Sequence, residues 1–180
     1  MIPLFIVLGI VVLLGGYFVT TQRSLVGLDE RVKNALSQIG VQQNSRWDAI
    51  TLLAKMVEKY SKHEHDTLLE TIAARRAGVI KSANEVTEQQ NAMDQILSRI
   101  NVVAEQYPQL KASDLYANTM NQVNEFENKV RMSRQIYNDV TTMMNQAVRQ
   151  WPSSIVANML GFKEQEYLKV SENKTEVPNF

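Results

Sequence analysis

The residues best suited to chemistry lie together at positions 63–66, which hold both histidines of the chain. The run reads His63-Glu64-His65-Asp66, and imidazole and carboxylate groups are common protein ligands of transition metals. Histidines two residues apart do not share a helix face, whereas helical metal pairs are spaced three or four residues apart. We therefore interpret the run as a solvated helix boundary, and a metal-dependent enzyme using these four residues is the weaker alternative.

Other signatures of catalysis are missing from the sequence. The chain has no cysteine, which excludes disulfides, thiolate zinc sites and cysteine nucleophiles, and it has no glycine-rich phosphate loop or GxSxG turn. Lys+Arg and Asp+Glu both number 19, so there is no positive surplus to neutralise a nucleic acid backbone. We assign no catalytic, cofactor-binding or metal residue, and we expect neither an enzyme nor a nucleic acid partner.

Two short basic groupings could touch an anionic leaflet or an acidic partner. Glutamates lie close to both groupings in the sequence, and this favours ordinary pairing along a helix. The groupings are Arg75-Arg76 with Lys81, and Lys129-Arg131-Arg134.

Large aromatic and sulfur-containing residues of the C-terminal half have two possible roles. Tyr137 and Trp151 lie on an apolar stripe, so we expect them to anchor the core with the phenol and the indole N–H reaching polar partners at its rim. Methionines are adaptable enough to fill gaps in a core or to form a partner-binding surface, and core filling is the more common role. The methionines concerned are Met120, Met132, Met143, Met144 and Met159.

The elements that must position these residues begin with a membrane segment. Ile2 to Val19 is an uncharged apolar run of about 18 residues, which as a helix spans about 27 Å, near the thickness of a hydrocarbon core. A cleaved signal peptide is the alternative, but no basic residues precede the run and no small-x-small cleavage site follows it. The run is therefore predicted to be a retained transmembrane anchor.

The residues flanking this run predict its orientation. Arg23, Arg31 and Lys33 follow it, whereas only the terminal amine precedes it. Because positive charge is retained on the cytoplasmic side, we expect the N-terminus outside and the rest of the chain in the cytoplasm.

Apolar residues beyond the anchor recur at steps of three and four, the period of a helical stripe, and strand-like alternation is absent. Three long segments carry such stripes. The first holds Leu25, Leu28, Val32, Leu36 and Ile39, then a polar patch at 42–46, then Ile50, Leu53, Val57 and Tyr60. The second runs from Ile72 to Tyr107, with Arg76 and Gln90 as polar interruptions, and the third runs from Tyr116 to Trp151. Breaks are expected at 61–66, near Pro108 and at Pro152.

These patterns predict an all-α fold, with an N-terminal transmembrane helix followed by an elongated antiparallel bundle. The bundle would have three long helices, of which the first could be kinked or split to give four, and a short C-terminal helix. The expected organisation is an anchor at 1–22, a bundle at 23–168 and a flexible tail at 169–180.

The sequence resembles the LemA family of bacterial membrane proteins over nearly its whole length, from the anchor to about Tyr167. Its most specific stretches are E-x-Y-P-x-L-K-A at 105–112 and R-x-x-Y-N at 134–138. The remaining matches are Ser24-Leu25-Val26, Arg31-Val32, Ile39-Gly40-Val41-Gln42, Arg46-Trp47-Asp48, Tyr60, His63-Glu64, Glu127-Asn128, Asn145, Trp151-Pro152, Ala157 and Gly161-Phe162.

The resemblance implies a short outer N-terminus, one transmembrane helix and a long helical bundle in the inner membrane of a bacterium. It implies no established enzymatic activity, and some relatives are associated with forming specialised membrane compartments. The chain departs from the family pattern at Thr51, where relatives have proline, and this favours a continuous first helix.

The leading hypothesis is a non-catalytic, membrane-anchored scaffold that self-associates and organises membrane or recruits cytoplasmic partners. Self-association is suggested by the polar seam residues Arg76 and Gln90, which could find partners between protomers. The alternative from another class is a signalling adaptor that binds one specific protein through its methionine and aromatic surface. The expected partners are thus the lipid bilayer, further copies of the chain and a cytoplasmic protein.

Overall fold

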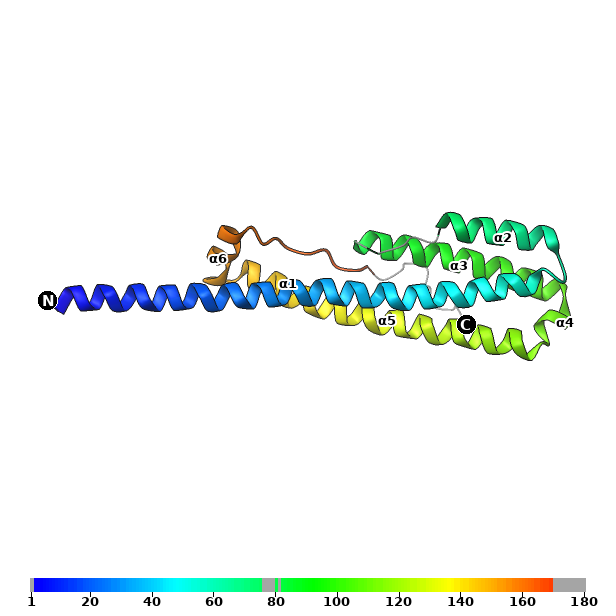
Figure 1. Cartoon of the computed structure of the whole chain (residues 1–180), viewed down its shortest axis with the longest axis horizontal. Coiled ribbons are helices and arrows are strands. Elements are labelled where there is room, and N and C mark those ends of the chain that lie inside the picture. Colours follow the sequence, from blue (N-terminus) through cyan, green and yellow to red (C-terminus); the bar gives the residue numbers. More distant parts are fainter. Residues whose placement is uncertain (1, 76–79, 81, 170–180) are drawn as a thin grey trace, which may run out of the picture. The chain divides into compact units, whose positions relative to one another are not determined.

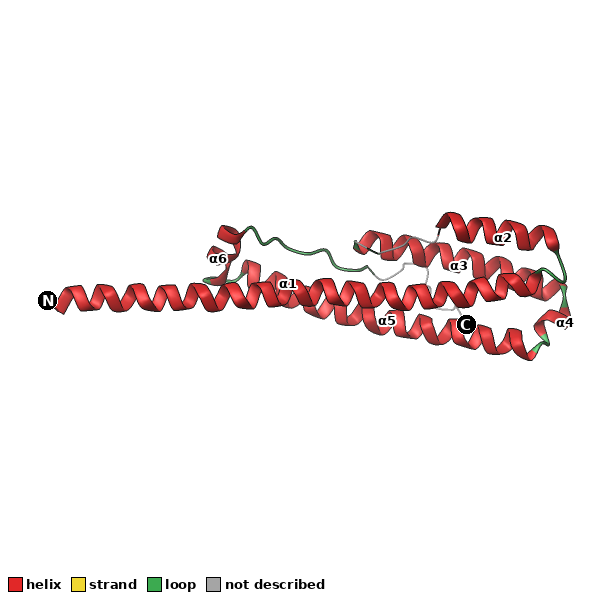
Figure 2. Cartoon of the chain, in the orientation of Figure 1, coloured by secondary structure: helices red, strands yellow, loops and turns green. Residues whose placement is uncertain are grey.

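The described part of the chain is helical and contains no strand (Figure 1, Figure 2). A computed structural model describes residues 2–75, 80 and 82–169. Their helices are α1 (Ile2–Val57), α2 (Lys62–Arg75), α3 (Ala83–Gln106), α4 (Pro108–Lys111), α5 (Asp114–Arg149) and α6 (Ser153–Leu160). The predicted all-α helical fold is confirmed.

The chain forms two compact units. Unit 1 comprises Met1–Ala35 with Ile136–Tyr167, and unit 2 comprises Leu36–Gln135 with Leu168–Phe180. The tail predicted at 169–180 lies outside the described residues from position 170 onward, and the predicted domain boundary at residue 22 falls inside α1.

The first helix is continuous from Ile2 to Val57, which answers the question of a kink at the polar patch or at Thr51. The Thr51 hydroxyl donates a hydrogen bond of 2.7 Å to the carbonyl of Trp47, and the Ser45 hydroxyl donates one of 3.2 Å to Val41. Both bonds join residues four apart, so the polar side chains are satisfied on the helix itself. A proline at 51 would have removed a backbone donor, whereas threonine keeps it.

The expectation of one long second helix from Ile72 to Tyr107 is wrong. α2 ends at Arg75 and α3 begins at Ala83, where the Ser82 hydroxyl accepts a hydrogen bond of 3.3 Å from the Glu85 amide. A serine N-cap satisfies an amide that the start of a helix leaves unpaired, and this local signal overrides an apolar register that continues through it. The predicted seam position Arg76 lies outside the described residues.

The break predicted at 61–66 occurs slightly earlier, between Val57 and Lys62. Ser61 precedes α2, and its hydroxyl accepts a bond of 3.4 Å from the Glu64 amide. The histidine-containing run therefore forms the first turn of a helix.

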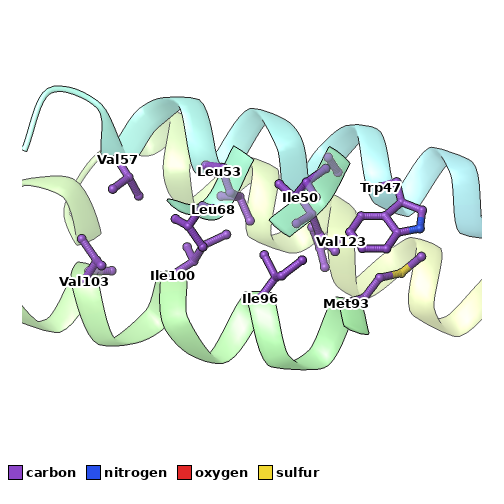
Figure 3. Close-up of a cluster of buried hydrophobic side chains, with 14 of the residues drawn as sticks. Trp47, Ile50, Leu53, Val57, Leu68, Met93, Ile96, Ile100, Val103 and Val123 are labelled. Carbon is purple, nitrogen blue, oxygen red and sulfur yellow. The ribbon is translucent and has the colours of Figure 1, made fainter. Parts of the chain in front are cut away.

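Unit 2 packs the last part of α1, α2, α3 and the first part of α5 side by side, with successive helices running in opposite directions (Figure 1). Figure 3 shows their apolar side chains meeting in one core, with Ile50 and Leu53 from α1, Leu68 from α2, Ile96 from α3 and Val123 from α5. All five side chains are almost fully buried, and such burial is the main stabilising term of the fold.

Unit 1 contains the start of α1, the end of α5, α6 and the segment up to Tyr167. Leu25 and Val32 of α1 are buried, as are Tyr137 and Met144 of α5. The stripe predicted for the third long helix thus holds as far as Met144.

Trp151 was predicted to be in the core, but its side chain is 80% exposed. α5 ends at Arg149, and Pro152 follows the tryptophan. Because proline cannot continue a helix, the register that would have buried Trp151 ends before reaching it.

The beginning of α1 has no packing partner within the described chain. Its large apolar side chains from Leu4 to Leu14 are exposed, and its best window has a mean hydropathy of 2.4 with none of the window buried. By length and composition this part of α1 could cross a membrane.

Candidate functional site

The most unusual feature of unit 2 is a buried arginine. Arg46 of α1 has a side chain only 2% exposed, and its Nη2 lies 2.9 Å from Oδ1 of Asp94 on α3 and 3.3 Å from Oε2 of Glu127 on α5. Its Nη1 lies 3.7 Å from the Sδ of Met93. We name Arg46, Asp94 and Glu127 the arginine cluster.

Electrostatics explain why the arginine cluster is arranged in this way. A guanidinium removed from water needs opposite charge and hydrogen-bond acceptors close by, and two carboxylates supply both. The Asp94 and Glu127 side chains are 44% and 25% exposed, so water solvates the negative ends of the cluster. The three side chains come from three helices, and this arrangement is suited to fixing the register of the bundle.

Amide side chains extend this polar layer along α1 and α3. The indole Nε1 of Trp47 donates a bond of 3.0 Å to Oε1 of Gln89, and Nε2 of Gln43 donates one of 2.9 Å to the carbonyl of Val86. Within the described residues, three buried atoms here lack a hydrogen-bond partner: Gln43 Oε1, Arg46 Nε and Gln89 Nε2.

Gln90, predicted to be a polar interruption that could require a second copy, finds its partner in its own chain. The Arg134 guanidinium donates to its Oε1 and also to the carbonyl of Lys169. Burial lowers the pKa of Arg134. Gln90 therefore gives no reason to expect self-association.

In the second basic grouping, Lys129 and Arg131 pair along α5, whereas Arg134 bonds to Gln90 on α3. Lys129 lies 2.6 Å from Glu125, one turn away, and Arg131 contacts Asn128. Arg76 and Lys81 of the other grouping lie outside the described residues.

In unit 1, an extended segment after α6 lies along α5, and we name residues 162–167 the strap. The side-chain amide of Asn145 holds the strap at one residue by two bonds: Nδ2 donates to the Gln165 carbonyl at 3.0 Å, and the Gln165 amide donates to Oδ1 at 2.8 Å. The Tyr137 hydroxyl donates a bond of 3.0 Å to the carbonyl of Glu166. The predicted role of Tyr137 as a buried anchor with a polar partner is confirmed.

Ion pairing, hydrogen bonding and burial shift the pKa values of groups in and around the strap. Arg149 pairs with Glu164, and this partnership raises the pKa of the arginine and lowers that of the carboxyl group. Burial raises the pKa of Tyr137. Hydrogen bonding with Thr142 and Asn145 lowers the pKa of Tyr167. The strap is thus held through the backbone groups of Gln165 and Glu166 and through the side chains of Glu164 and Tyr167.

Unit 1 also contains a hollow of about 390 Å³ where α1 leaves its apolar run. Its lining is rich in hydroxyl and amide groups, including Thr20, Thr21, Gln150 and Ser153, and contains no charged residue. The chemistry of this lining fits uncharged polar groups.

The histidine-containing run does not form a shared site. His65 is buried, with Nδ1 3.1 Å from Oδ1 of Asp66 and Nε2 4.0 Å from Glu58, whereas His63 is exposed and lines a separate hollow with Glu64. Among the residues that the structure describes, no three His, Asp or Glu side chains come together as a metal-binding group.

The five methionines divide between the two roles considered for them. Met144 is fully buried and Met120 packs against the core, whereas Met132, Met143 and Met159 are at least half exposed.

Sequence reasoning missed Arg46 and Trp47 as core residues. The only signal that could have placed them in the core was the helical spacing of the apolar residues before and after them in the sequence.

Comparison with protein families gives a match over residues 35–180, to the family described as the LemA family. The chain belongs to the LemA family. The match begins beyond the apolar run, so it concerns both units without the first part of α1.

Two kinds of curated protein are similar to this LemA-family chain. Magnetosome protein MamQ 2 of Paramagnetospirillum magneticum is 27% identical over 127 residues, which cover 59% of this chain and 47% of that protein. Magnetosome protein MamQ of Magnetospirillum gryphiswaldense is 26% identical over 125 residues, covering 58% of this chain and 46% of the relative. The chain therefore matches about half the length of these MamQ relatives.

Protein LemA of Metamycoplasma hominis is 24% identical over 160 residues, covering 87% of this chain and 73% of that protein. Together the comparisons place the chain among proteins whose names describe no enzyme.

Proposed function

We propose that this LemA-family protein is a non-catalytic scaffold tethered to the bacterial inner membrane, which self-associates and organises membrane or recruits cytoplasmic partners. The observation that carries the proposal is α1, because one unbroken helix supplies both an exposed apolar run and part of the core of unit 2. A large apolar surface left in water is costly, and a bilayer is the environment that accommodates it.

The similarity to proteins named for the magnetosome supports a role in building or organising a cellular structure. The arginine cluster and the Trp47–Gln89 bond join the helices of unit 2 to one another. Neither the arginine cluster nor the Trp47–Gln89 bond requires a bound substrate.

Membrane extraction tests the tether. We expect the full-length protein to remain in the membrane fraction after washing with alkaline carbonate, and Ile10→Arg in the middle of the apolar run to release it, because a charge at that depth is costly. A matched change at the exposed residue Val102 of α3, Val102→Arg, should leave the protein in the membrane. Release of the unaltered protein would overturn the proposal.

Orientation can be tested by cysteine labelling, since the chain has no native cysteine. The exposed cations Arg23 and Arg31 follow the apolar run and favour a cytoplasmic location for the bundle. A Leu115→Cys variant should then react with a membrane-impermeant maleimide only after cells are lysed. Labelling in intact cells would place the bundle outside and contradict the proposed orientation.

Self-association is supported by an exposed apolar row on α5. Met132, Ile136 and Met143 are 65%, 55% and 50% exposed and are spaced by four and seven residues, which places them on one helical face. Such a row resembles half of a helix–helix interface. We expect Ile136→Gln with Met143→Gln to reduce the mass of the detergent-solubilised protein to that of a monomer.

The control for the mass measurement is Val102→Gln, which alters an exposed apolar residue on a different helix. A monomeric unaltered protein at concentrations reached in membranes would remove self-association from the proposal. Crosslinking in cells through Met132→Cys then separates the candidates: adducts between copies favour a scaffold, and a single stoichiometric foreign protein favours the adaptor.

A further inference from the structure

α6 and the tryptophan before it present an apolar face that nothing in the described chain covers. Trp151, Ile155 and Met159 are 80%, 53% and 71% exposed, and their spacing of four residues places Ile155 and Met159 on one side of α6. Val156 and Ala157 are buried, so the opposite side of the helix packs into unit 1. α6 is thus held in place while its exposed side remains apolar.

The surrounding sequence has the composition of an interfacial segment. No charged residue occurs between Arg149 and Lys163, and the stretch contains a tryptophan and several small polar residues. Tryptophan is enriched where hydrocarbon meets the headgroup layer, because its ring is apolar and its N–H can reach water or a headgroup.

The position of α6 within unit 1 supplies the second observation. Ser153, its first residue, lines the same hollow as Thr20 and Thr21, which directly follow the last apolar residue of the run, Val19. In Figure 1, α6 lies beside α1 within this unit. The start of α6 is therefore level with the point where α1 would leave the hydrocarbon core.

We propose that Trp151 and α6 form a second membrane contact, lying in the interfacial layer of the bilayer that α1 crosses. The proposal rests on the proposed function, because the depth of α6 is defined by the anchor. Lipid is the occupant favoured here, since α6 begins at the uncharged polar hollow that residues of α1 and α5 line with Ser153, and this hollow lies where the apolar run ends, at headgroup depth.

Single-cysteine variants of the full-length protein test this contact directly, because the chain has no native cysteine. Met159→Cys, Ile155→Cys, Met132→Cys and Ile10→Cys would each be labelled with an environment-sensitive fluorophore. Each variant would be reconstituted into vesicles of phosphatidylethanolamine and phosphatidylglycerol, with or without two nitroxide lipids, one labelled near the headgroup for interfacial sites and one labelled deep in the acyl chain for the anchor site. The nitroxide quenches only labels that contact lipid.

We expect the labels at 155 and 159 to lose most of their emission to the nitroxide lipids, as the anchor label at 10 does. The label at 132, on an exposed part of α5, should change little. If the label at 10 is quenched but those at 155 and 159 behave like the one at 132, the second contact is wrong and the tether stands. If the label at 10 also escapes quenching, both proposals fail.

A second copy of the chain covering α6 would give a different result. The labels at 155 and 159 would then emit strongly, as in an apolar environment, but would not respond to the nitroxide lipids. This outcome would also overturn the proposal. A Met159→Ser variant with its label at 155 should lose part of the quenching, whereas Met132→Ser with the same label should not.

Discussion

Arg46 is a charge in the core of unit 2 that two carboxylates from neighbouring helices make tolerable. Buried ion pairs contribute little compared with apolar residues of the same shape, but removing one partner is costly because the other is left behind. The loss of stability on replacing Arg46 should therefore depend more on how well the new side chain fills the space than on the loss of the positive charge.

Arg46→Ala should destabilise the protein by about 3 kcal/mol, because it leaves a cavity and takes away the guanidinium that Asp94 and Glu127 share. Arg46→Met should cost less, roughly 1 kcal/mol, because methionine fills the volume and removes the unpartnered Nε, while Asp94 and Glu127 remain partly solvated. Urea unfolding of the full-length protein in detergent micelles would measure both changes. The control is Arg99→Ala, an exposed arginine of α3, and an equal loss from it would contradict the prediction.

The hold of Asn145 on the strap makes a second prediction at this scale. Asn145→Ala removes both bonds to Gln165, and we expect hydrogen–deuterium exchange of the Gln165 amide to accelerate by at least about tenfold. Asn145→Asp keeps an acceptor for the amide but sets a carboxylate against the Gln165 carbonyl, so part of the effect should remain. The role of Asn145 would be contradicted if exchange of the Gln165 amide were unchanged in both variants. It would also be contradicted if an Asn121→Ala control elsewhere on α5 accelerated this exchange equally.

Sequence reasoning succeeded for Tyr137 and failed for Trp151 and Trp47, and the two failures have different physical reasons. Periodicity predicts burial only while a helix continues, so the register was right up to Met144 and wrong once α5 ended before Pro152. Arg46 and Trp47 were overlooked because Arg46 ends the polar patch and Trp47 follows it, and their burial depends on partners on α3 and α5 that no local pattern reveals. The strap has no periodicity at all, and its position follows from hydrogen bonds to backbone groups.

At the scale of the elements, two glycines differ in backbone conformation: one is helical and the other is left-handed. Gly40 lies inside α1, and a Cβ placed there would lie 3.8 Å from the Ile80 side chain, an ordinary contact distance. Gly161 ends α6 with a φ of 77°, in the left-handed region that other residues rarely adopt.

Gly40→Ala should stabilise the protein by about 0.5–1 kcal/mol, because alanine loses less backbone entropy in a helix. Gly161→Ala should instead destabilise by roughly 1 kcal/mol, since its backbone conformation is strained for an L-residue. Thermal unfolding of the two variants side by side provides the measurement. Destabilisation by Gly40→Ala would contradict the ordinary contact distance between this position and the Ile80 side chain.

Element boundaries also mark where the sequence was ambiguous. The run from Ile72 to Tyr107 keeps a helical register through Ser82, yet a serine cap divides it. In α1 the reverse occurred: the polar patch at 42–46 suggested a break, but the Ser45 hydroxyl bonds within the helix and Gln43 and Arg46 bond to α3. Apolar periodicity thus identified which stretches are helical, while single hydroxyl groups decided where helices start or continue.

At the scale of the whole molecule, the pH dependence of stability should reflect buried tyrosines in both units. Burial raises the pKa of Tyr116 in unit 2 and of Tyr137 in unit 1, so each keeps its proton in the folded state after the unfolded chain has lost it. Above about pH 10 the unfolded state binds fewer protons, and stability therefore falls as pH rises. The exposed Tyr167, whose pKa is lowered, opposes this trend.

We expect the urea midpoint to decline between about pH 9 and about pH 11, and to decline less in a protein that carries both Tyr116→Phe and Tyr137→Phe. Tyr60→Phe is the matched control, because it removes the hydroxyl of a tyrosine other than Tyr116 and Tyr137. The Tyr60 ring lies near Tyr107, with ring centroids 5.6 Å apart and ring planes tilted by 44°. An alkaline decline that the double variant leaves intact would assign the effect to other groups.

The continuity of α1 has a consequence for how the protein is made. The ribosome delivers the apolar run first and the core residues Ile50 and Leu53 soon after, whereas their partner Val123 on α5 emerges much later. During that interval the core face of α1 has no lasting cover, and an uncovered apolar face on a nascent chain attracts chaperones and other nascent chains. We therefore expect slowed translation after α1 to increase misassembly at the membrane. The exposure should end once α5 has been synthesised and can cover the core face of α1.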